Sequence, residues 1–371
     1  MGYYNVNIVS SQFYVFIIIS NKTLPLSKIK TDHMSDSLKA EDFINKHKTH
    51  GWPIIDVRSP SEFHKGHIPT AYNIPIFKDT ERKEIGRIYK QVNKEEAVKK
   101  GLEFIGPRLR SMVEEAESLN ADNMLAYCWR GGMRSNSFAW LLRILDVNII
   151  TLHGGYKAFR NFVLNSFLSK KKIYILGGFT GSGKTEVLHE FKKMGEQIID
   201  IEGLANHKGS VFGHLGEREQ PTNQQFENEL AMEWIKTKSD KPIWIEDESR
   251  IIGQVTVPND FFMQMKTSPV FFLDLPRYLR IQRLVKEYTV FPQESLRESI
   301  LRIQRKLGGV NAKLALESID QKHCEKAVEI TLKYYDKTYT YMLSQRNHDQ
   351  IYKYSSNTTD AIQNAKRILS M

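Results

Sequence analysis

Short apolar runs alternate with amphipathic stretches along the first half of the chain. The runs typical of buried strands are "PIIDV" (53–57), "NMLAYC" (123–128) and "NIITL" (148–152). The stretches with helical spacing are 37–47, 134–145 and 157–168. Strands that alternate with helices predict a parallel sheet, whose functional loops follow the carboxyl ends of the strands.

The same alternation restarts after a basic linker, "SKKK" (169–172). One apolar run leads into a glycine-rich turn, and three later runs each end in an acid: "QIIDIEG", "PIWIEDES" and "PVFFLDLP". From Tyr278 onward the pattern is helical and basic, so we expect helices up to the C-terminus. The chain is predicted to hold two α/β domains, residues 36–168 and 173–371, the second with a basic helical C-terminal region.

Residues 1–35 differ in character from the rest of the chain. "NIVSSQFYVFIIIS" is apolar, but it is shorter than the roughly 20 residues that cross a bilayer. A secretory signal has basic residues before its apolar core, and here the first basic residue is Lys22. We interpret this segment as a disordered extension or a misassigned start, and we expect no membrane association.

The charge balance favours a polyanionic partner. The 371 residues carry a net charge of +10 and the pI is about 9.3, which favours nucleic acid over an acidic protein. Cys128 and Cys324 lie far apart in the sequence, so no disulfide framework is implied. A reducing, cytoplasmic location is therefore expected.

A phosphate-binding loop is the most specific motif in the second half. "GFTGSGKT" fits G-x-x-x-x-G-K-[ST], follows a predicted strand and opens a predicted helix. Glycines let backbone amides curl around a phosphate, the lysine reaches the outer phosphates, and the threonine could hold a magnesium ion. The motif predicts phosphate or diphosphate binding by Gly178, Gly181, Ser182, Gly183, Lys184 and Thr185.

Polar residues that follow the next strands are candidate substrate contacts, because open α/β sheets bind ligands at strand ends. These candidates are Asp200, Glu202, Asn206, His207, Lys208, Asp247, Glu248 and Arg250. His207 taken alone would more often be structural. Asp247 or Glu248 could bind a metal or be an ordinary strand-end carboxylate, and both interpretations stay open. We expect no dedicated metal site and no tightly bound cofactor.

Cys128 stands where a strand gives way to a helix, in the stretch "YCWRGGMRS" (127–135). Among inward-facing amides, at a helix N-terminus and near arginine, the pKa of a thiol falls from about 8.5 to roughly 3.5–7.5. Cys128 is therefore predicted to be a nucleophile at neutral pH, with an inert cysteine in a turn as the alternative. The loop that would grip an oxyanion, or carry sulfur or selenium, comprises Arg130, Gly131, Gly132, Arg134 and Ser135.

A basic region between 277 and 313 is a candidate nucleic-acid contact. Leu296, Ile300, Ile303 and Leu307 recur at helical spacing and predict one buried stripe. The residues predicted on the opposite side are Arg302, Arg305 and Lys306. They could contact a nucleic-acid backbone or form a solvated helix face, and the charged region from 78 to 110 is a second candidate.

Several of these motifs together resemble a known family. "IIDVRSPSEFHKGHIPTAYNIP", "YCWRGGMRS" and "GGYKAF" resemble a rhodanese domain, whose active cysteine matches Cys128. Joined to the phosphate loop, "DIEGLANHKGS", "IEDESRIIG" and "YYDKTYTY", they resemble the bacterial tRNA 2-selenouridine synthase family from about residue 36 to the C-terminus. The resemblance implies a rhodanese-like parallel-sheet domain followed by a P-loop NTPase-like α/β domain.

The resemblance also implies an activity, that of a transferase acting on wobble 2-thiouridine in tRNA. Geranyl diphosphate would first geranylate the sulfur, and selenium from selenophosphate would then displace the S-geranyl group to give 2-selenouridine. Arg130 and Arg134 would hold the anionic donor while Cys128 carries or delivers selenium. Asp56 and Arg58 match rhodanese positions and are expected to brace the loop.

Two alternatives remain at this point. C-x5-R is also the spacing of cysteine phosphatases, so the chain could be a phosphatase fused to a kinase-like domain, although no acid for the leaving group stands close in sequence. It could also be a non-catalytic RNA-binding module. The presence of Cys128, Lys184 and Thr185 counts against that interpretation.

Overall fold

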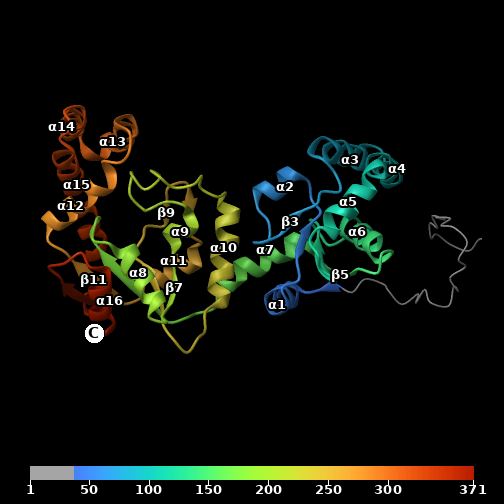
Figure 1. Ribbon diagram of the computed structural model, residues 1–371, viewed down its shortest axis with the longest axis horizontal. Helices are drawn as coiled ribbons and strands as arrows, with labels where there is room; N and C mark the ends of the chain where they lie inside the picture. The colour runs from blue at the N-terminus through green and yellow to red at the C-terminus, as the bar shows by residue number, and fades with distance from the viewer. Residues whose placement is uncertain (1–36) are drawn as a thin grey trace, which may run out of the picture. The chain divides into compact units, whose positions relative to one another are not determined.

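Two five-stranded sheets, each parallel throughout, organise the computed structural model, which describes residues 37–371 (Figure 1). The interpretation of residues 1–35 lies outside the described residues. The first sheet forms in the half that contains Cys128 and the second in the half that contains the phosphate loop. The predicted α/β class, with one parallel-sheet half followed by another, is confirmed.

The first sheet places Cys128 at the end of its central strand. Its strands, in spatial order, are β1 (Ser37–Leu38), β5 (Asn148–Leu152), β4 (Asn123–Tyr127), β2 (Ile54–Asp56) and β3 (Tyr72–Asn73). Its helices are α1 (Ala40–His50), α2 (Pro60–Lys65), α6 (Met133–Arg143) and α7 (Gly155–Ser166). Because β4 is covered on both faces, its residues 124–127 are buried, which explains the continuous apolar run in the sequence.

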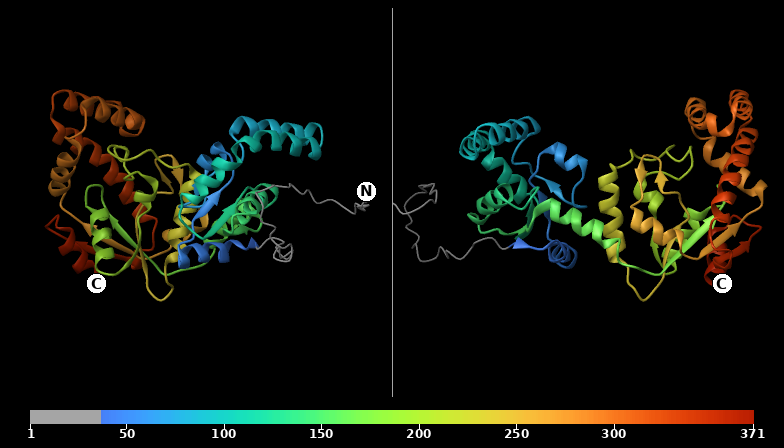
Figure 2. Two further views of the ribbon diagram at one scale, coloured as in Figure 1. Left: turned by 45° about the vertical axis from the view of Figure 1, so that its right-hand side comes forward. Right: turned by 180° about the vertical axis from the view of Figure 1, so that it is seen from behind.

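The charged region between 78 and 110 folds as helices that extend from this sheet. They are α3 (Asp79–Gln91), α4 (Lys94–Ile105), the 3-10 turn η2 (Gly106–Arg108) and α5 (Leu109–Glu117). Helices α3 and α4 run side by side as a hairpin (Figure 2). Arg108 ties the base of the hairpin by donating to Glu81 Oε2 at 2.6 Å.

The second sheet carries the phosphate loop on its middle strand. Its strands, in spatial order, are β12 (Ile351–Ser355), β11 (Val270–Asp274), β6 (Ile173–Gly178), β8 (Ile243–Glu246) and β7 (Gln197–Ile199). Its helices are α8 (Lys184–Lys193), α9 (Ile201–Ala205), α10 (Asn223–Lys236), α11 (Asn259–Lys266) and α16 (Ala361–Leu369). A small antiparallel hairpin pairs β9 (Ile251–Ile252) with β10 (Val255–Thr256).

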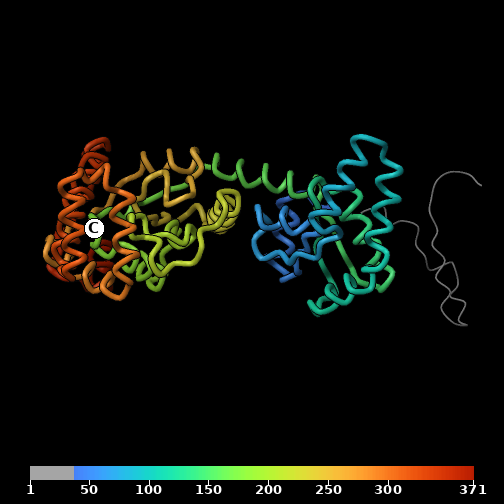
Figure 3. Tube along the Cα trace, turned by 90° about the horizontal axis from the view of Figure 1, so that it is seen from above, coloured from blue at the N-terminus to red at the C-terminus, as the bar shows by residue number. Residues whose placement is uncertain are grey.

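The C-terminal region is mostly helical, but the expectation of helices up to the C-terminus was wrong. Helices α12 (Arg277–Tyr288), α13 (Gln293–Leu307), α14 (Gly309–Asp320) and α15 (Cys324–Ser344) form an orange and red group in Figure 3. After a 3-10 turn, η3 (His348–Gln350), strand β12 returns to pair with β11. Strand β12 lies at the sheet edge and is partly exposed, so its sequence lacks a long apolar run.

Helices α7 and α10 join the two halves through one continuous apolar cluster. Trp234 of α10 is buried and donates its indole N–H to Ser166 O at 3.0 Å. Arg160 Nη1 on α7 hydrogen-bonds Asn228, and its Nη2 pairs with Glu227. A buried apolar contact reinforced by partly buried polar pairs holds these two helices together.

Candidate active site

The Cys128 loop is shaped by glycines that no side chain could replace. A Cβ on Gly131, at φ +62°, would lie 2.4 Å from Leu152 O, and one on Gly155, at φ +60°, would lie 2.3 Å from Gly131 N. The turn that begins α7 therefore presses against the back of the loop. Tyr156 N donates to Cys128 O at 2.8 Å and fixes the cysteine backbone at the end of β4.

The surroundings of Cys128 favour its thiolate. Burial alone would raise the pKa of the thiol, but hydrogen bonds from Ser135 and from the Gly132 amide, with the charge of Arg134, lower the pKa overall. Ser135 Oγ and Gly132 N each lie 3.4 Å from Cys128 Sγ. The side chain is 4% exposed, so a donor must approach through the loop itself. This arrangement suits a nucleophile or a carrier of selenium.

We expect removal of the Ser135 hydroxyl to raise the pKa of Cys128. In a Cys324→Ser background, where Cys128 is the only thiol, the alkylation rate plotted against pH reports its titration. The midpoint should lie below that of free cysteine, and Ser135→Ala should move it to higher pH because one stabilising hydrogen bond is lost. Ser137→Ala, an exposed change on the same helix, is the matched control. Equal midpoints in both variants would contradict this account.

The two loop arginines are placed differently. Arg134 Nη1 donates to Glu62 Oε2 at 2.8 Å, which joins α6 to α2 beside the cysteine. Arg130 is exposed at the rim of the loop. Their predicted contact with an anionic donor stays a prediction. Sequence reasoning missed Glu62, because its pairing with Arg134 spans 72 residues.

Asp56 and Arg58 form a buried pair near the end of β4, and their expected role in bracing the loop stays a prediction. Arg58 Nη2 lies 2.6 Å from Asp56 Oδ2 and 2.7 Å from Gly66 O, and its guanidinium lies 3.8 Å from the ring centre of Tyr156. Because both charges are buried and their hydrogen bonds are satisfied, the pair is structural rather than free to bind ligand.

The phosphate loop has the backbone that its motif requires. Gly181 and Gly183 adopt φ of +81° and +82°, and α8 begins at Lys184. Lys184 Nζ lies 3.3 Å from Gly178 O. Burial alone would lower the pKa of Lys184, but nearby carboxylates, led by Glu248 and Glu202, raise it, so the side chain stays charged. The hydroxyl of Ser182 is buried without a hydrogen-bond partner among residues 37–371.

Three glutamates lie near Lys184, and two of them, Glu202 and Glu246, are buried. Burial and the neighbouring carboxylates raise the pKa of Glu202 to about 8, burial raises that of Glu246 to about 8, and the pKa of Glu248 is raised well above its usual range. Thr185 Oγ1 donates to Glu202 Oε2 at 3.2 Å. A Cβ on Gly209 would lie 2.5 Å from Glu248 Oε2 and 2.6 Å from Glu202 Oε1, so the backbone passes directly against both carboxylates.

Glu246 was missed by the sequence reasoning, which singled out Asp247 and Glu248. Glu246 is fully buried, and its carboxylate oxygens have no hydrogen-bond partner within the described residues. Asp247 instead accepts from Tyr339 Oη at 2.6 Å and pairs with Arg346. The run of acids after "PIWI" was the available signal, but it does not say which of them lies beside the phosphate loop.

The other predicted substrate contacts have mixed surroundings. Asp200 Oδ1 caps α9 by accepting from Gly203 N at 2.7 Å, and Asn206 donates to Glu219 O at 2.9 Å. Lys208 pairs with Glu287 of α12 at 2.7 Å. His207 is buried, and burial lowers its pKa. Arg250 is exposed after β8. Glu202 and Glu248 are therefore the members of this set whose charges act most strongly on Lys184.

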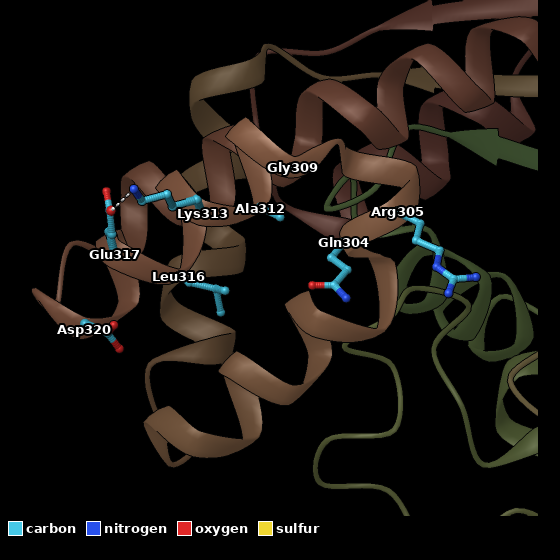
Figure 4. A pocket seen from close by; sticks show the side chains of 8 residues that line it. All are labelled: Gln304, Arg305, Gly309, Ala312, Lys313, Leu316, Glu317 and Asp320. Carbon is cyan, nitrogen blue, oxygen red and sulfur yellow. Dashed lines mark ion pairs between the residues drawn. The ribbon is translucent and has the colours of Figure 1, made fainter.

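The basic face of α13 is exposed as predicted. Leu296, Ile300, Ile303 and Leu307 are buried, whereas the exposed residues include Arg302, Arg305 and Lys306. A cavity of about 450 Å³ lies between α13 and α14. Figure 4 shows its lining, with Gln304 and Arg305 from α13 and the other residues from α14. Lys313 lies 3.9 Å from Glu317 on the same helix, so the lining carries both signs of charge. The contact of α13 with tRNA stays a prediction.

Residues 37–371 lack two further features. Within that range, no group of three or more His, Cys, Asp and Glu side chains is arranged to hold a metal ion. No helix in the same part of the chain is long and apolar enough to cross a bilayer.

Comparison with known proteins matches both halves of the chain. Residues 171–368 match the family described as the tRNA 2-selenouridine synthase AAA domain, and residues 39–162 match the rhodanese-like domain. A relative from Shewanella woodyi, named tRNA 2-selenouridine synthase, is 32% identical over 82% of this chain and 91% of its own length. The relative of that name from Bdellovibrio bacteriovorus is 33% identical over 81% of this chain and 91% of its own.

A third relative, from Hydrogenovibrio crunogenus, carries the same name and is 35% identical over 79% of this chain and 90% of its own length. Each alignment spans most of both proteins and so includes the Cys128 loop and the phosphate loop together. The chain therefore belongs to the tRNA 2-selenouridine synthase family.

Proposed function

We propose that this protein converts wobble 2-thiouridine in tRNA to 2-selenouridine by S-geranylation followed by selenium transfer. One observation carries the proposal: Cys128, with Ser135 Oγ and Gly132 N each 3.4 Å from its sulfur, and a phosphate loop whose Lys184 begins α8 occur in one chain of this family. The family supports a tRNA-modifying transferase over the phosphatase and the non-catalytic alternatives. The positive net charge of +10 suits a polyanionic substrate.

The first step would take place at the phosphate loop. The sulfur of 2-thiouridine attacks C1 of geranyl diphosphate, the C1–O bond breaks, and pyrophosphate leaves. The base loses its N3 proton, so that the product is a thioether with a C2=N3 double bond. Lys184 and the loop amides would hold the diphosphate and stabilise the charge that grows on its bridging oxygen.

Magnesium would fit beside the same loop. Three carboxylates surround a single lysine, and the oxygens of Glu246 have no hydrogen-bond partner among residues 37–371, so a cation or protons are needed before a diphosphate can bind. Thr185 and Glu246 would be the ligands. When bound, the ion would neutralise charge on the departing pyrophosphate.

The second step would take place at the Cys128 loop. Cys128 would deliver the selenium at the selenide level: its thiolate attacks the phosphorus of selenophosphate, the P–Se bond breaks and selenide leaves, with Arg130 and the loop amides close to the anionic donor. Selenide attacks C2 of the base, the C2–S bond breaks, geranylthiol leaves and N3 regains a proton. Water then hydrolyses the S–P bond on Cys128 and releases phosphate. Arg134 pairs with Glu62, so it must exchange that carboxylate for selenophosphate in order to bind the donor.

The decisive experiment is mass analysis of nucleosides from 2-thiouridine tRNA treated with the protein, geranyl diphosphate and selenophosphate. We expect S-geranyl-2-thiouridine when selenophosphate is omitted and 2-selenouridine when both donors are present. Omission of geranyl diphosphate should leave 2-thiouridine unchanged. Hydrolysis of p-nitrophenyl phosphate without any change in the tRNA would instead support the phosphatase alternative.

The double change Arg302→Ala and Arg305→Ala should weaken tRNA binding and reduce its salt dependence. Both side chains are exposed on one face of α13, and each phosphate contact that is lost should reduce the slope of log K against log salt by roughly one unit. Titration of tRNA at several salt concentrations measures this slope. Lys192→Ala, an exposed change on α8, should leave it unaltered. An unchanged slope in the double variant would identify this surface as an ordinary solvated helix face.

A further inference from the structure

We propose that a cavity beside the Cys128 loop binds the wobble nucleotide, with its base stacked on Trp129 and its backbone near Lys65 and Arg82. The cavity has a volume of about 370 Å³, within the range of ligand pockets in proteins. It is lined by Arg58, Glu62, Lys65, Arg82, Trp129 and Gln224. This inference rests on the proposed function, because it assigns a position to the substrate of that reaction.

Trp129 is placed to stack a base next to the reactive sulfur. It follows Cys128 directly, its side chain is 37% exposed, and its carbonyl accepts from Lys157 N at 3.0 Å, which fixes its backbone. Its ring lies 5.9 Å from that of Tyr156, at 43°, so the indole is supported on the inner side. Exposed aromatic rings bind unstacked bases in proteins that recognise single-stranded RNA. Selenophosphate has no aromatic base and is much smaller than a nucleotide, so it would neither stack on Trp129 nor fill most of the cavity.

The charges around the cavity favour an anion. Asp56 neutralises Arg58 at 2.6 Å, and Arg134 lies 2.8 Å from Glu62. Lys65 is exposed on α2, and Arg82 approaches the already paired Glu62 at 3.5 Å without making a hydrogen bond to it. The cavity therefore retains positive charge from Lys65 and Arg82, which suits a nucleotide phosphate.

Gln224 brings the second half of the chain to this cavity. It lies on α10, whose start is fixed to the loop after α2. Thr222 Oγ1 donates to Lys65 O at 2.7 Å, Gln225 Oε1 accepts from His67 N at 2.9 Å, and Asn228 Nδ2 donates to His67 O at 2.8 Å. With its neighbours held in this way, the amide of Gln224 offers a donor and an acceptor to the edge of a stacked base. A nucleotide bound here would touch residues from both halves.

The test uses the full chain and an anticodon stem-loop RNA that carries S-geranyl-2-thiouridine at the wobble position. Selenation kinetics with this RNA separate KM from kcat, and quenching of tryptophan fluorescence reports binding directly. We expect Trp129→Ala to raise the KM for RNA about tenfold or more, as loss of one stacking contact implies, with a smaller effect on kcat. Trp129→Phe should restore most of the affinity, and Lys65→Ala and Gln224→Ala should also raise KM.

Matched controls distinguish the loss of a contact in this cavity from the general effect of removing an exposed tryptophan or lysine. Trp140→Ala removes an exposed tryptophan on α6 and Lys192→Ala an exposed lysine on α8, and neither should change KM. RNA binding should quench the wild-type protein more than Trp129→Phe. If Trp129→Ala selenates the RNA with the wild-type KM, or if quenching is the same in the wild type and Trp129→Phe, the cavity is not the nucleotide site. A wild-type protein that binds and quenches but forms no 2-selenouridine would contradict the proposed function and leave the cavity assignment standing.

Discussion

Replacement of Cys128 by serine should leave a protein that geranylates 2-thiouridine tRNA and then stops. Serine can occupy the same place among Ser135 and the Gly132 amide, so the loop should keep its shape. Its hydroxyl does not ionise near neutral pH, whereas the surroundings lower the pKa of the cysteine thiol. The phosphate loop lies on a different sheet and is untouched by this change. Formation of 2-selenouridine should fall by at least about a thousandfold, as when a catalytic nucleophile is removed.

Chromatography of the nucleosides measures this result, because S-geranyl-2-thiouridine should accumulate in place of 2-selenouridine. Cys324→Ser is the control, since that cysteine lies at the start of α15 and is expected to be idle. It should form 2-selenouridine at the rate of the unmodified protein. If Cys128→Ser also does so, the cysteine does not handle selenium, and the loop serves only to cradle an anion.

The Cys128 loop and the phosphate loop could be predicted from the sequence, because the backbone conformation of each depends on residues that are close together in the chain. Glycines at 131, 181 and 183 mark positions where φ is positive, and each loop follows an apolar run short enough to be a buried strand. The buried stripe of α13 was predictable for a similar reason, since helical spacing is a local pattern. The site residues themselves remain predictions until variants are assayed.

Long-range pairing is what the sequence could not supply. Glu62 meets Arg134 across 72 residues, and no local pattern links them. The neighbouring acids Glu246 and Asp247 are equivalent in the sequence, but the end of β8 turns one toward Lys184 and the other toward Tyr339 and Arg346. Strand β12 was missed because it pairs only on one side and exposes alternate polar residues.

Replacement of Lys184 by alanine should block S-geranylation and leave selenium transfer intact, whereas Cys128→Ser should do the reverse. The charged ammonium lies at the start of α8, 3.3 Å from Gly178 O, where it would meet the outer phosphate of geranyl diphosphate. Without it, charge on the departing pyrophosphate is stabilised less, and the three nearby glutamates are left without their cation. S-geranylation should fall by about 100- to 1,000-fold, the usual loss when one group that stabilises a developing anion is removed.

The same variant should still convert tRNA that already carries S-geranyl-2-thiouridine, because the Cys128 loop does not depend on Lys184. Nucleoside analysis of both substrates, with Lys192→Ala as an exposed-lysine control on the same helix, separates loss of one step from loss of folding. A variant that fails on both substrates and melts at lower temperature has lost its fold rather than its first step. Lys184→Arg then provides a second test. Because this variant keeps the charge, it should geranylate faster than Lys184→Ala. If Lys184→Ala geranylates at the normal rate, the phosphate loop serves another ligand, and a nucleoside triphosphate becomes the first to test.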